Sequence, residues 1–370
     1  MNNEIILRTS KGEYHPGQTV YGGVYLNVCR PTEANGIKIS FRALETCVYE
    51  YECHGNKKLK NETAHVDFSD VNLYSQADCF DFGSYVFPFK FDLPKEIPGT
   101  FQYLGHTSKT SWEVQVTYTL NAKAAGADIL QTSQLIVIYQ VQEEALKDSK
   151  WGSACSVSYE TTRFFLRRQK IHITARLIEN YQTSGSNMQL RLIVTNPTKL
   201  KVKSFRILLL RYLKLYVREK MADKMLDNME YNSDVFHIAP ENGPHIVYSR
   251  EGDLGSFDID SLELDQLQIP LRERLLGEDT ETDIPPSVVG THVKNQYQLE
   301  ITIVFENNYR KVFNLKVPGV LPEKNQQWLQ WRPPDWTFKA ECKLSRSLFS
   351  VQESTLRTEA FSGLPTFQVL

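Results

Sequence analysis

The chain has 370 residues, which is too long for one β-sandwich and sufficient for two domains that each bury a core. Its net charge is −2, with 41% hydrophobic and 23% charged residues, so no overall field favours nucleic acid or an anionic membrane. The chain contains no apolar run of about 18 residues. Its start, Met-Asn-Asn-Glu, lacks the basic and apolar regions of a secretory signal, so we expect a cytosolic protein that is not transmembrane.

The sequence offers no constellation for catalysis or metal binding. It lacks G-x-S-x-G, P-loop and H-E-x-x-H motifs, and none of its six cysteines forms a C-x-x-C pair. His54 and His65 could be grouped with Cys47, Cys53 and Cys79, but their spacing fits no zinc pattern. We therefore expect free structural thiols, no catalytic residue, no metal, no cofactor and no enzymatic activity.

Period-2 alternation of apolar and polar residues dominates the first half of the chain and predicts half-buried strands. In the segment from Gly36, the inward positions are Ile37, Ile39, Phe41 and Ala43. The same pattern continues at Tyr85, Phe87, Phe89, Phe91 and Leu93, and again at Trp112, Val114, Val116, Tyr118 and Leu120. Pro88 cannot donate to a strand ladder, so its strand is expected at a sheet edge or a bulge.

The second half repeats this pattern. Tyr297, Leu299, Ile301, Ile303 and Phe305 alternate with polar residues, and strands are also expected at 190–194, 201–210 and 313–317. A different period appears at Met221, Met225 and Met229, which have helical spacing. This segment predicts either a short helix that packs its methionines or a Met-rich docking surface.

An internal repeat links the two halves. Val28-Cys-Arg-Pro-Thr is followed by Phe41-Arg-Ala-Leu, and Val194-Thr-Asn-Pro-Thr is followed by Phe205-Arg-Ile-Leu. Because the landmarks occur twice in the same order, we infer duplication of one sandwich unit. The polar segment at 142–158 has no period and separates the two units.

Four further motifs resemble the arrestin family. The chain has Tyr14-His-Pro-Gly-Gln-Thr-Val-Tyr-Gly22, then Gly83-Ser-Tyr-Val-Phe-Pro-Phe-Lys-Phe-Asp-Leu-Pro94, then Ile97-Pro-Gly-Thr-Phe101. These resemble the arrestin N-domain, and Ile284-Pro-Pro-Ser287 before the strand at Tyr297 is similar to the C-domain signature. The resemblance covers about residues 5–318 and is closer to the α-arrestins (arrestin domain-containing proteins) than to visual and β-arrestins.

The resemblance implies an all-β fold of two tandem immunoglobulin-like sandwiches that bind cargo on their concave faces. We expect an N-terminal sandwich at 1–141, a linker at 142–164, a C-terminal sandwich at 165–318 and a tail at 319–370. The motif prolines and glycines are interpreted as scaffold residues that shape turns and bends: Pro16, Gly17, Gly22, Pro94, Pro98, Gly99, Pro285 and Pro286.

The leading functional hypothesis is an adaptor in membrane-protein trafficking. It would bind cytoplasmic tails of membrane proteins and connect them to endocytic, sorting or ubiquitination machinery, at the plasma membrane or endosomes. Open sheet edges suit the binding of extended peptides by strand addition. The alternative is a fixed structural subunit of an endosomal retrieval or coat complex.

The C-terminal tail carries a degenerate form of a ubiquitin-ligase docking motif. Many α-arrestins have P-P-x-Y motifs there, which bind WW domains through a prolyl helix and a Tyr. This chain has no such motif, and its nearest match is Pro333-Pro334-Asp335-Trp336. We expect a packing segment here, with WW binding as the alternative.

A basic run in the second half is a candidate phosphate or anionic-lipid patch. Lys199, Lys201 and Lys203 alternate along a predicted strand, which places them on one face, and Arg206 follows. Visual and β-arrestins bind inositol phosphates through a basic patch of the C-domain, and this strand resembles that region in position. The other interpretation is a solvated face whose lysines prevent edge-to-edge aggregation.

Overall fold

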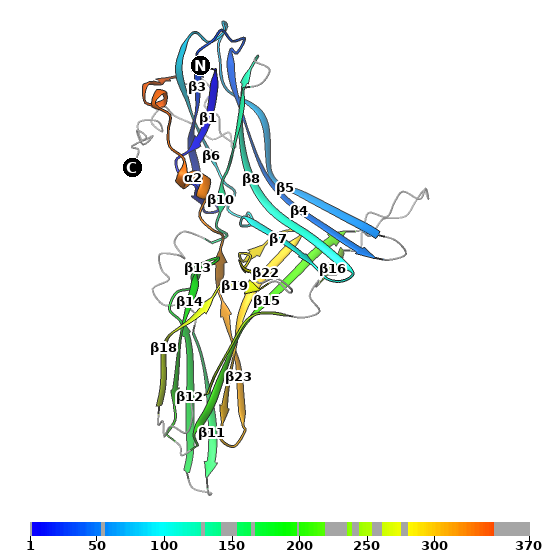
Figure 1. Cartoon of the computed structure of the whole chain (residues 1–370), viewed down its shortest axis with the longest axis vertical. Coiled ribbons are helices and arrows are strands. Elements are labelled where there is room, and N and C mark those ends of the chain that lie inside the picture. The colour runs from blue at the N-terminus through cyan, green and yellow to red at the C-terminus, as the bar shows by residue number, and fades with distance from the viewer. Residues whose placement is uncertain are drawn as a thin grey trace.

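A computed structural model describes residues 2–52, 56–126, 130–141, 154–163, 167–197, 200–218, 235–238, 244–253, 261–274 and 280–343. It is an elongated all-β molecule with one sandwich at each end of its long axis (Figure 1). Helix in the described residues is confined to α2 (Gln326–Gln330) and η2 (Asp335–Lys339). The prediction of an all-β fold with two sandwiches is confirmed.

The first sandwich contains two main sheets. One has the strand order β1-β3-β6-β25, and the other has the order β5-β4-β8-β7, with β9 beside β8. Their bounds are β1 (Glu4–Thr9), β3 (Thr19–Val28), β6 (Gly83–Asp92), β25 (Glu341–Cys342), β5 (Asn56–Ser75), β4 (Gly36–Glu52), β8 (Thr110–Ala125), β7 (Phe101–His106) and β9 (Gln131–Leu135). A short parallel pair, β2 (Glu13–Tyr14) and β10 (Val137–Ile138), completes this unit.

The second sandwich also has two main sheets. One has the order β11-β12-β14-β18, and the other has the order β16-β15-β22-β21, with β17 on β15 and β23 on β22. Their bounds are β11 (Ala154–Arg163), β12 (Arg167–Leu177), β14 (Asn187–Thr195), β18 (Ser261–Pro270), β16 (Val235–Ile238), β15 (Val202–Arg218), β22 (Val293–Phe305), β21 (Val288–Val289), β17 (His245–Asp253) and β23 (Arg310–Val317). Two short pairs join β13 (Tyr181–Thr183) to β24 (Gly319–Leu321) and β19 (Arg272–Arg274) to β20 (Glu281–Asp283).

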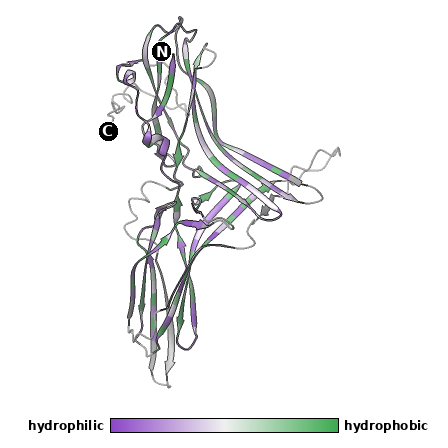
Figure 2. Cartoon of the chain, in the orientation of Figure 1, coloured by the Kyte–Doolittle hydropathy of each residue, from purple (hydrophilic) through white to green (hydrophobic). Residues whose placement is uncertain are grey.

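The predicted alternation matches the observed burial. Ile37, Ile39 and Phe41 of β4 are fully buried, whereas Lys38 and Ser40 between them are half-buried on the opposite face. Figure 2 shows the same alternation of hydrophobic and hydrophilic residues along the strands of both sandwiches. The internal repeat also has a structural counterpart, because β4 pairs antiparallel with β8 as β15 does with β22.

Two predicted boundaries differ from the structure. Residues 154–163, expected in the linker, form β11, which pairs along its whole length with β12. β11 is an edge strand with mostly small and polar residues, so it lacks the apolar alternation that would reveal it. Residues 319–321, expected in the tail, form β24 and belong to the second sandwich. The Met221–Met229 segment and most of the linker lie outside the described residues.

β15 connects the two hydrophobic cores. Phe205, Ile207 and Leu209 from its first part belong to the core of the second sandwich. Leu213, Leu215 and Val217 from its last part pack in the core of the first sandwich, together with Val288 and Val293. The first sandwich is therefore completed by residues of the second, and the two cores meet along one strand.

We predict that the two sandwiches unfold together. Leu215→Ala removes a fully buried side chain and should lower the free energy of unfolding by about 2–5 kcal/mol. Leu209→Ala, in the other core, should shift the same transition. Tryptophan fluorescence in urea can report this in a Trp151→Phe background, because the other four of the chain's five tryptophans, Trp112, Trp328, Trp331 and Trp336, lie on the first sandwich.

Val312→Ala is the matched control, because this side chain lies 51% exposed on β23 and should have little effect. If Leu209→Ala leaves the tryptophan transition unchanged while circular dichroism shows an earlier phase, the sandwiches are independent.

Candidate functional site

A buried carboxylate joins the two sandwiches. Glu45 of β4 is fully buried and accepts hydrogen bonds from three successive backbone amides of the second sandwich. The donors are the amides of Thr291 (2.9 Å), His292 (2.6 Å) and Val293 (3.1 Å). Gly290 leaves room for this contact, since a Cβ there would lie 2.4 Å from Glu45 Oε1. A carboxylate from one unit is thus held in a backbone anion nest of the other.

Two histidines complete this contact. His65 Nε2 lies 2.7 Å from Glu45 Oε2, and the Thr63 hydroxyl lies 2.8 Å from His292 Nε2. Burial alone would raise the pKa of Glu45, but the hydrogen bonds from His65 and from the His292 and Thr291 amides outweigh it and hold that pKa below its usual value. Glu45 is therefore ionised at neutral pH, and we call its contacts with residues 291–293 the Glu45 clamp.

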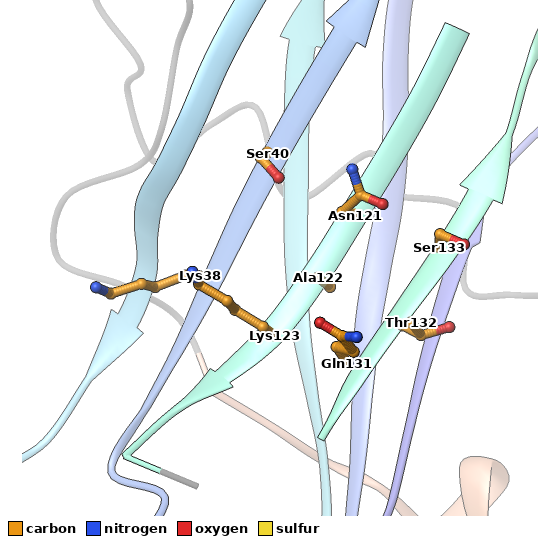
Figure 3. A pocket seen from close by; sticks show the side chains of 8 residues that line it. All are labelled: Lys38, Ser40, Asn121, Ala122, Lys123, Gln131, Thr132 and Ser133. Atoms are coloured by element: carbon orange, nitrogen blue, oxygen red, sulfur yellow. The ribbon is translucent and has the colours of Figure 1, made fainter. Parts of the chain in front are cut away.

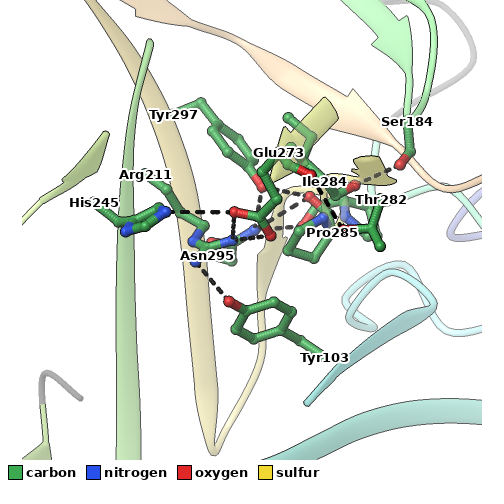
Figure 4. A network of polar contacts seen from close by, with 11 residues as sticks. Tyr103, Ser184, Arg211, His245, Glu273, Thr282, Ile284, Pro285, Asn295 and Tyr297 are labelled. Carbon is green, nitrogen blue, oxygen red and sulfur yellow. Dashed lines mark hydrogen bonds and ion pairs between the residues drawn. The ribbon is translucent and has the colours of Figure 1, made fainter. Parts of the chain in front are cut away.

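A second polar network lies where β15 passes between the two cores (Figure 4). Arg211 of β15 and Glu273 of β19 are both buried, and Nη1 of Arg211 donates to both carboxylate oxygens at 2.8 and 2.9 Å. Nη2 of Arg211 donates to the hydroxyl of Tyr103, on β7 of the first sandwich, at 2.6 Å. His245 Nε2 lies 3.6 Å from Glu273. Through the hydrogen bond from Arg211 to Tyr103, this network also connects the two sandwiches.

The segment after the second sandwich returns to the first. We call residues 325–343 the C-terminal segment; its Asn325 amide donates to Glu13, and its Trp328 indole donates to the Thr9 carbonyl. Arg8 of β1 lies against two rings, 4.1 Å from the centre of Trp328 and 4.5 Å from that of Trp331. Burial lowers the pKa of Arg8 to about 10. This value is still well above neutral pH, so the guanidinium is charged and forms cation–π contacts with both rings.

These polar contacts contain no evident catalytic arrangement. Among the residues that the structure describes, no three His, Cys, Asp or Glu side chains are grouped as a metal site. In the same part of the chain, no helix is long and apolar enough to span a membrane. The geometry supports a rigid double sandwich, with its charged groups used to join the units.

Comparison with known proteins agrees with this architecture. Residues 3–179 match the family "Arrestin (or S-antigen), N-terminal domain", and residues 167–322 match "Arrestin (or S-antigen), C-terminal domain". The chain belongs to the arrestin family. It is 23% identical over 211 residues to "Arrestin domain-containing protein A" of Dictyostelium discoideum, a match that covers 52% of this chain and 35% of that relative. The chain thus matches about a third of the length of that arrestin domain-containing protein.

The scaffold residues of the arrestin motifs lie at turns and close contacts. Gly17 has a φ of 80°, which favours glycine, and its amide donates to the Pro94 carbonyl. A Cβ on Gly22 would lie 2.3 Å from the Phe89 ring. Four of the five remaining motif residues also make close contacts: the Tyr118 hydroxyl donates to the Pro98 carbonyl, Gly99 faces Gln140, the Tyr297 hydroxyl donates to the Pro285 carbonyl, and the Asn295 side-chain amide donates to the Pro286 carbonyl.

The predicted basic patch is only partly assembled. Lys203 and Arg206 are exposed and Lys201 is half-buried, while Val202 and Phe205 point into the core. A register shift between Val202 and Ser204 brings Arg206 to the outer face, where it forms an ion pair with Glu251 at 3.2 Å. Lys199 lies outside the described residues.

The degenerate WW motif lies within the C-terminal segment. Pro333 precedes Pro334, which caps η2, and Trp336 lies inside this 3₁₀-helix. Its indole donates to Glu4 of β1 at 3.0 Å. A WW ligand instead presents its aromatic residue from an extended prolyl helix. This placement favours the packing interpretation over a ligase dock.

Sequence reasoning missed Glu45, Arg211 and the Arg8–Trp328 contact. A signal for the first two was present, because each occupies an inward position of a period-2 run, next to Ala43 and Cys47 or next to Leu209 and Leu213. A charged residue at such a position needs a buried partner.

We predict that Glu45→Gln lowers the free energy of unfolding at pH 7 by about 3 kcal/mol, because an amide NH₂ would face backbone donors. Since the pKa of Glu45 is lower in the folded chain, its ionised form stabilises the fold above the unfolded pKa of about 4.3. That contribution is lost as pH falls through the folded value. Urea unfolding from pH 7 to about pH 3 should therefore show the variant and the wild type converging.

Glu50→Gln is the matched control on the same strand. The side chain of Glu50 is 45% exposed and pairs with that of Lys58 in an ion pair open to solvent, so its loss should matter little at pH 7. Equal stability of Glu45→Gln and wild type at pH 7 would contradict the Glu45 clamp.

Proposed function

We propose that this arrestin-family protein is a non-enzymatic adaptor of the α-arrestin group. It binds cytoplasmic tails of membrane proteins and connects them to endocytic, sorting or ubiquitination machinery, peripherally at the plasma membrane or endosomes. The observation that carries the proposal is the pair of arrestin domains, whose cores share β15 and which are held together by buried polar contacts. A fixed arrangement of two sheet surfaces is suited to recognising partners without large rearrangement.

Proximity labelling with the full-length chain in its native cell tests this proposal. An adaptor should label several different membrane proteins above a cytosolic control that carries the labelling enzyme alone. A single constant set of coat subunits, present at stoichiometric amounts on native gels, would instead identify a fixed structural subunit of a retrieval or coat complex.

We also propose that the basic patch recruits the protein weakly to anionic lipid headgroups. Each Lys near an anionic membrane contributes about 1 kcal/mol, so Lys201→Glu/Lys203→Glu should abolish low-salt co-sedimentation with phosphoinositide liposomes. Arg206→Gln should have a smaller effect, because Glu251 already neutralises this guanidinium.

The matched control is Lys95→Glu/Lys109→Glu, which makes the same charge change at two exposed lysines of the first sandwich. The patch is only a solvated face if both double variants sediment alike, or if the wild type does not sediment at low salt.

We further propose that Pro333-Pro334-Asp335-Trp336 does not recruit WW domains. A Trp331–Lys339 peptide and the full chain should both fail to bind a WW-domain panel in fluorescence anisotropy. Trp336→Tyr should make the peptide bind, whereas the full-length variant should bind more weakly than its peptide because the segment packs on β1 and β6. Micromolar binding of the wild-type peptide would refute the proposal.

A further inference from the structure

A groove lies beside β1 on the first sandwich, between β9 and the C-terminal segment. Its volume is about 280 Å³. β1 lines it with Glu4, Ile6 and Arg8, β9 with residues 132–135, and the C-terminal segment chiefly with Trp328, Trp331 and Pro334. β9 also borders a polar hollow that it forms with β4 and β8, where Lys38 and Lys123 are cross-strand partners (Figure 3). We call the first of these two sites the β1 groove.

β1 places opposite charges at the two ends of this groove. Glu4, Ile6 and Arg8 lie on the outer face of the strand, because they alternate with residues buried in the core. At about 3.3 Å per residue, the Cα atoms of Glu4 and Arg8 are roughly 13 Å apart. This separation exceeds the Debye length of about 8 Å at physiological salt, so the two charges do not neutralise each other.

Arg8 is partly desolvated without a carboxylate to balance it. Its Nη2 donates to the Trp328 carbonyl at 2.6 Å, and its guanidinium lies against the rings of Trp328 and Trp331, so all its contacts are with neutral groups. Among the residues that the structure describes, no carboxylate lies within ion-pair distance of it. The low pKa of Arg8 has the same origin, since burial disfavours the cation and no nearby anion restores it.

Glu4 at the other end is in a similar position. Its carboxylate accepts a hydrogen bond from the Trp336 indole at 3.0 Å, which is a neutral donor. In the described part of the chain, no lysine, arginine or histidine lies within ion-pair distance of Glu4. Each end of the β1 groove therefore favours a ligand group of the opposite charge.

The middle of the groove and its size indicate what kind of ligand fits. Ile6 is half-buried there and lies between the two charges, with Trp331 and Pro334 in the same lining. The hydroxyls of Thr132 and Ser133 can bond peptide groups. Pockets for whole small molecules usually exceed about 300 Å³, so this groove suits a few side chains of a larger partner.

We propose that the β1 groove binds an extended peptide that presents an acidic, an apolar and a basic side chain at alternate positions. Such side chains share one face of an extended chain, with the spacing of Glu4, Ile6 and Arg8. The acidic side chain pairs with Arg8, the apolar one contacts Ile6, and the basic one pairs with Glu4. The proposal rests on the proposed adaptor function and specifies a tail chemistry that needs no phosphorylation.

The test measures the anisotropy of fluorescein-labelled peptides with the full-length chain at low salt. The probes are Ser-Glu-Ser-Leu-Ser-Lys-Ser and its reverse, Ser-Lys-Ser-Leu-Ser-Glu-Ser, because the groove can take a peptide in either direction. One of them should bind more tightly than Ser-Glu-Lys-Leu-Ser-Ser-Ser, which has the same composition but places its charges on opposite faces.

A charge swap identifies the groove. Glu4→Lys should bind the preferred peptide about tenfold more weakly, because attraction becomes like-charge repulsion, and should bind more tightly than wild type to the peptide in which Glu replaces Lys. The gain is the decisive readout, since a C-terminal segment loosened by the lost Trp336 contact would weaken binding of both peptides. Glu33→Lys makes the same charge change at an exposed residue of the same sandwich and should leave both affinities unchanged.

The remaining outcomes separate this groove from the adaptor function. Equal binding of the alternating and the rearranged peptides, or equal effects of Glu4→Lys and Glu33→Lys, would overturn the groove and leave the proximity-labelling result untouched. Binding only after phosphoserine replaces the peptide's Glu would make the Arg8 end a phosphate site and also overturn the proposal. Peptide binding without membrane-protein neighbours would reject the adaptor while keeping the groove.

Discussion

The passage of β15 from one hydrophobic core to the other is the constraint on which the rest of the structure depends. A strand has alternating faces, so a strand that serves two cores must present apolar residues inward on both sides of the junction. β15 does so with Leu209 before the junction and Leu213 after it. Arg211 lies between them at an inward position, where the apolar surroundings of either core are incomplete and its guanidinium meets Glu273 and Tyr103.

Buried charges at such a junction determine its geometry more than its stability. Desolvation cancels much of the attraction within a buried ion pair, and an apolar replacement of similar volume can be as stable. A nest of backbone amides or a Tyr hydroxyl, however, holds its hydrogen-bond partner in only one orientation. The Glu45 clamp and the Arg211–Tyr103 contact therefore specify one angle between two sandwiches whose apolar interface alone would allow several.

Much of the fold could be predicted from the sequence, because alternation depends only on which face of a strand meets a core. Phe41, Tyr118 and Ile301 are buried as their periods indicate. β11 escaped prediction because an edge strand need not bury an alternating face. The cross-strand pair of Lys38 and Lys123 required the register of β4 against β8, which joins segments about 85 positions apart and is not visible in either segment alone.

The C-terminal segment shows the same limit and adds a third connection across the junction. Its tryptophans gave no periodic signal, because they pack on the outside of the first sandwich at separate points of β1: Trp328 binds Thr9 at one end of the strand, and Trp336 binds Glu4 at the other. β24 pairs in the second sandwich only four positions before Asn325 binds Glu13 in the first. A rotation of the sandwiches must therefore strain this short connection while it breaks the Glu45 clamp and exposes Leu213 and Leu215. Because these costs fall together, partner binding is expected to use the preformed faces of the sandwiches, with their relative angle unchanged.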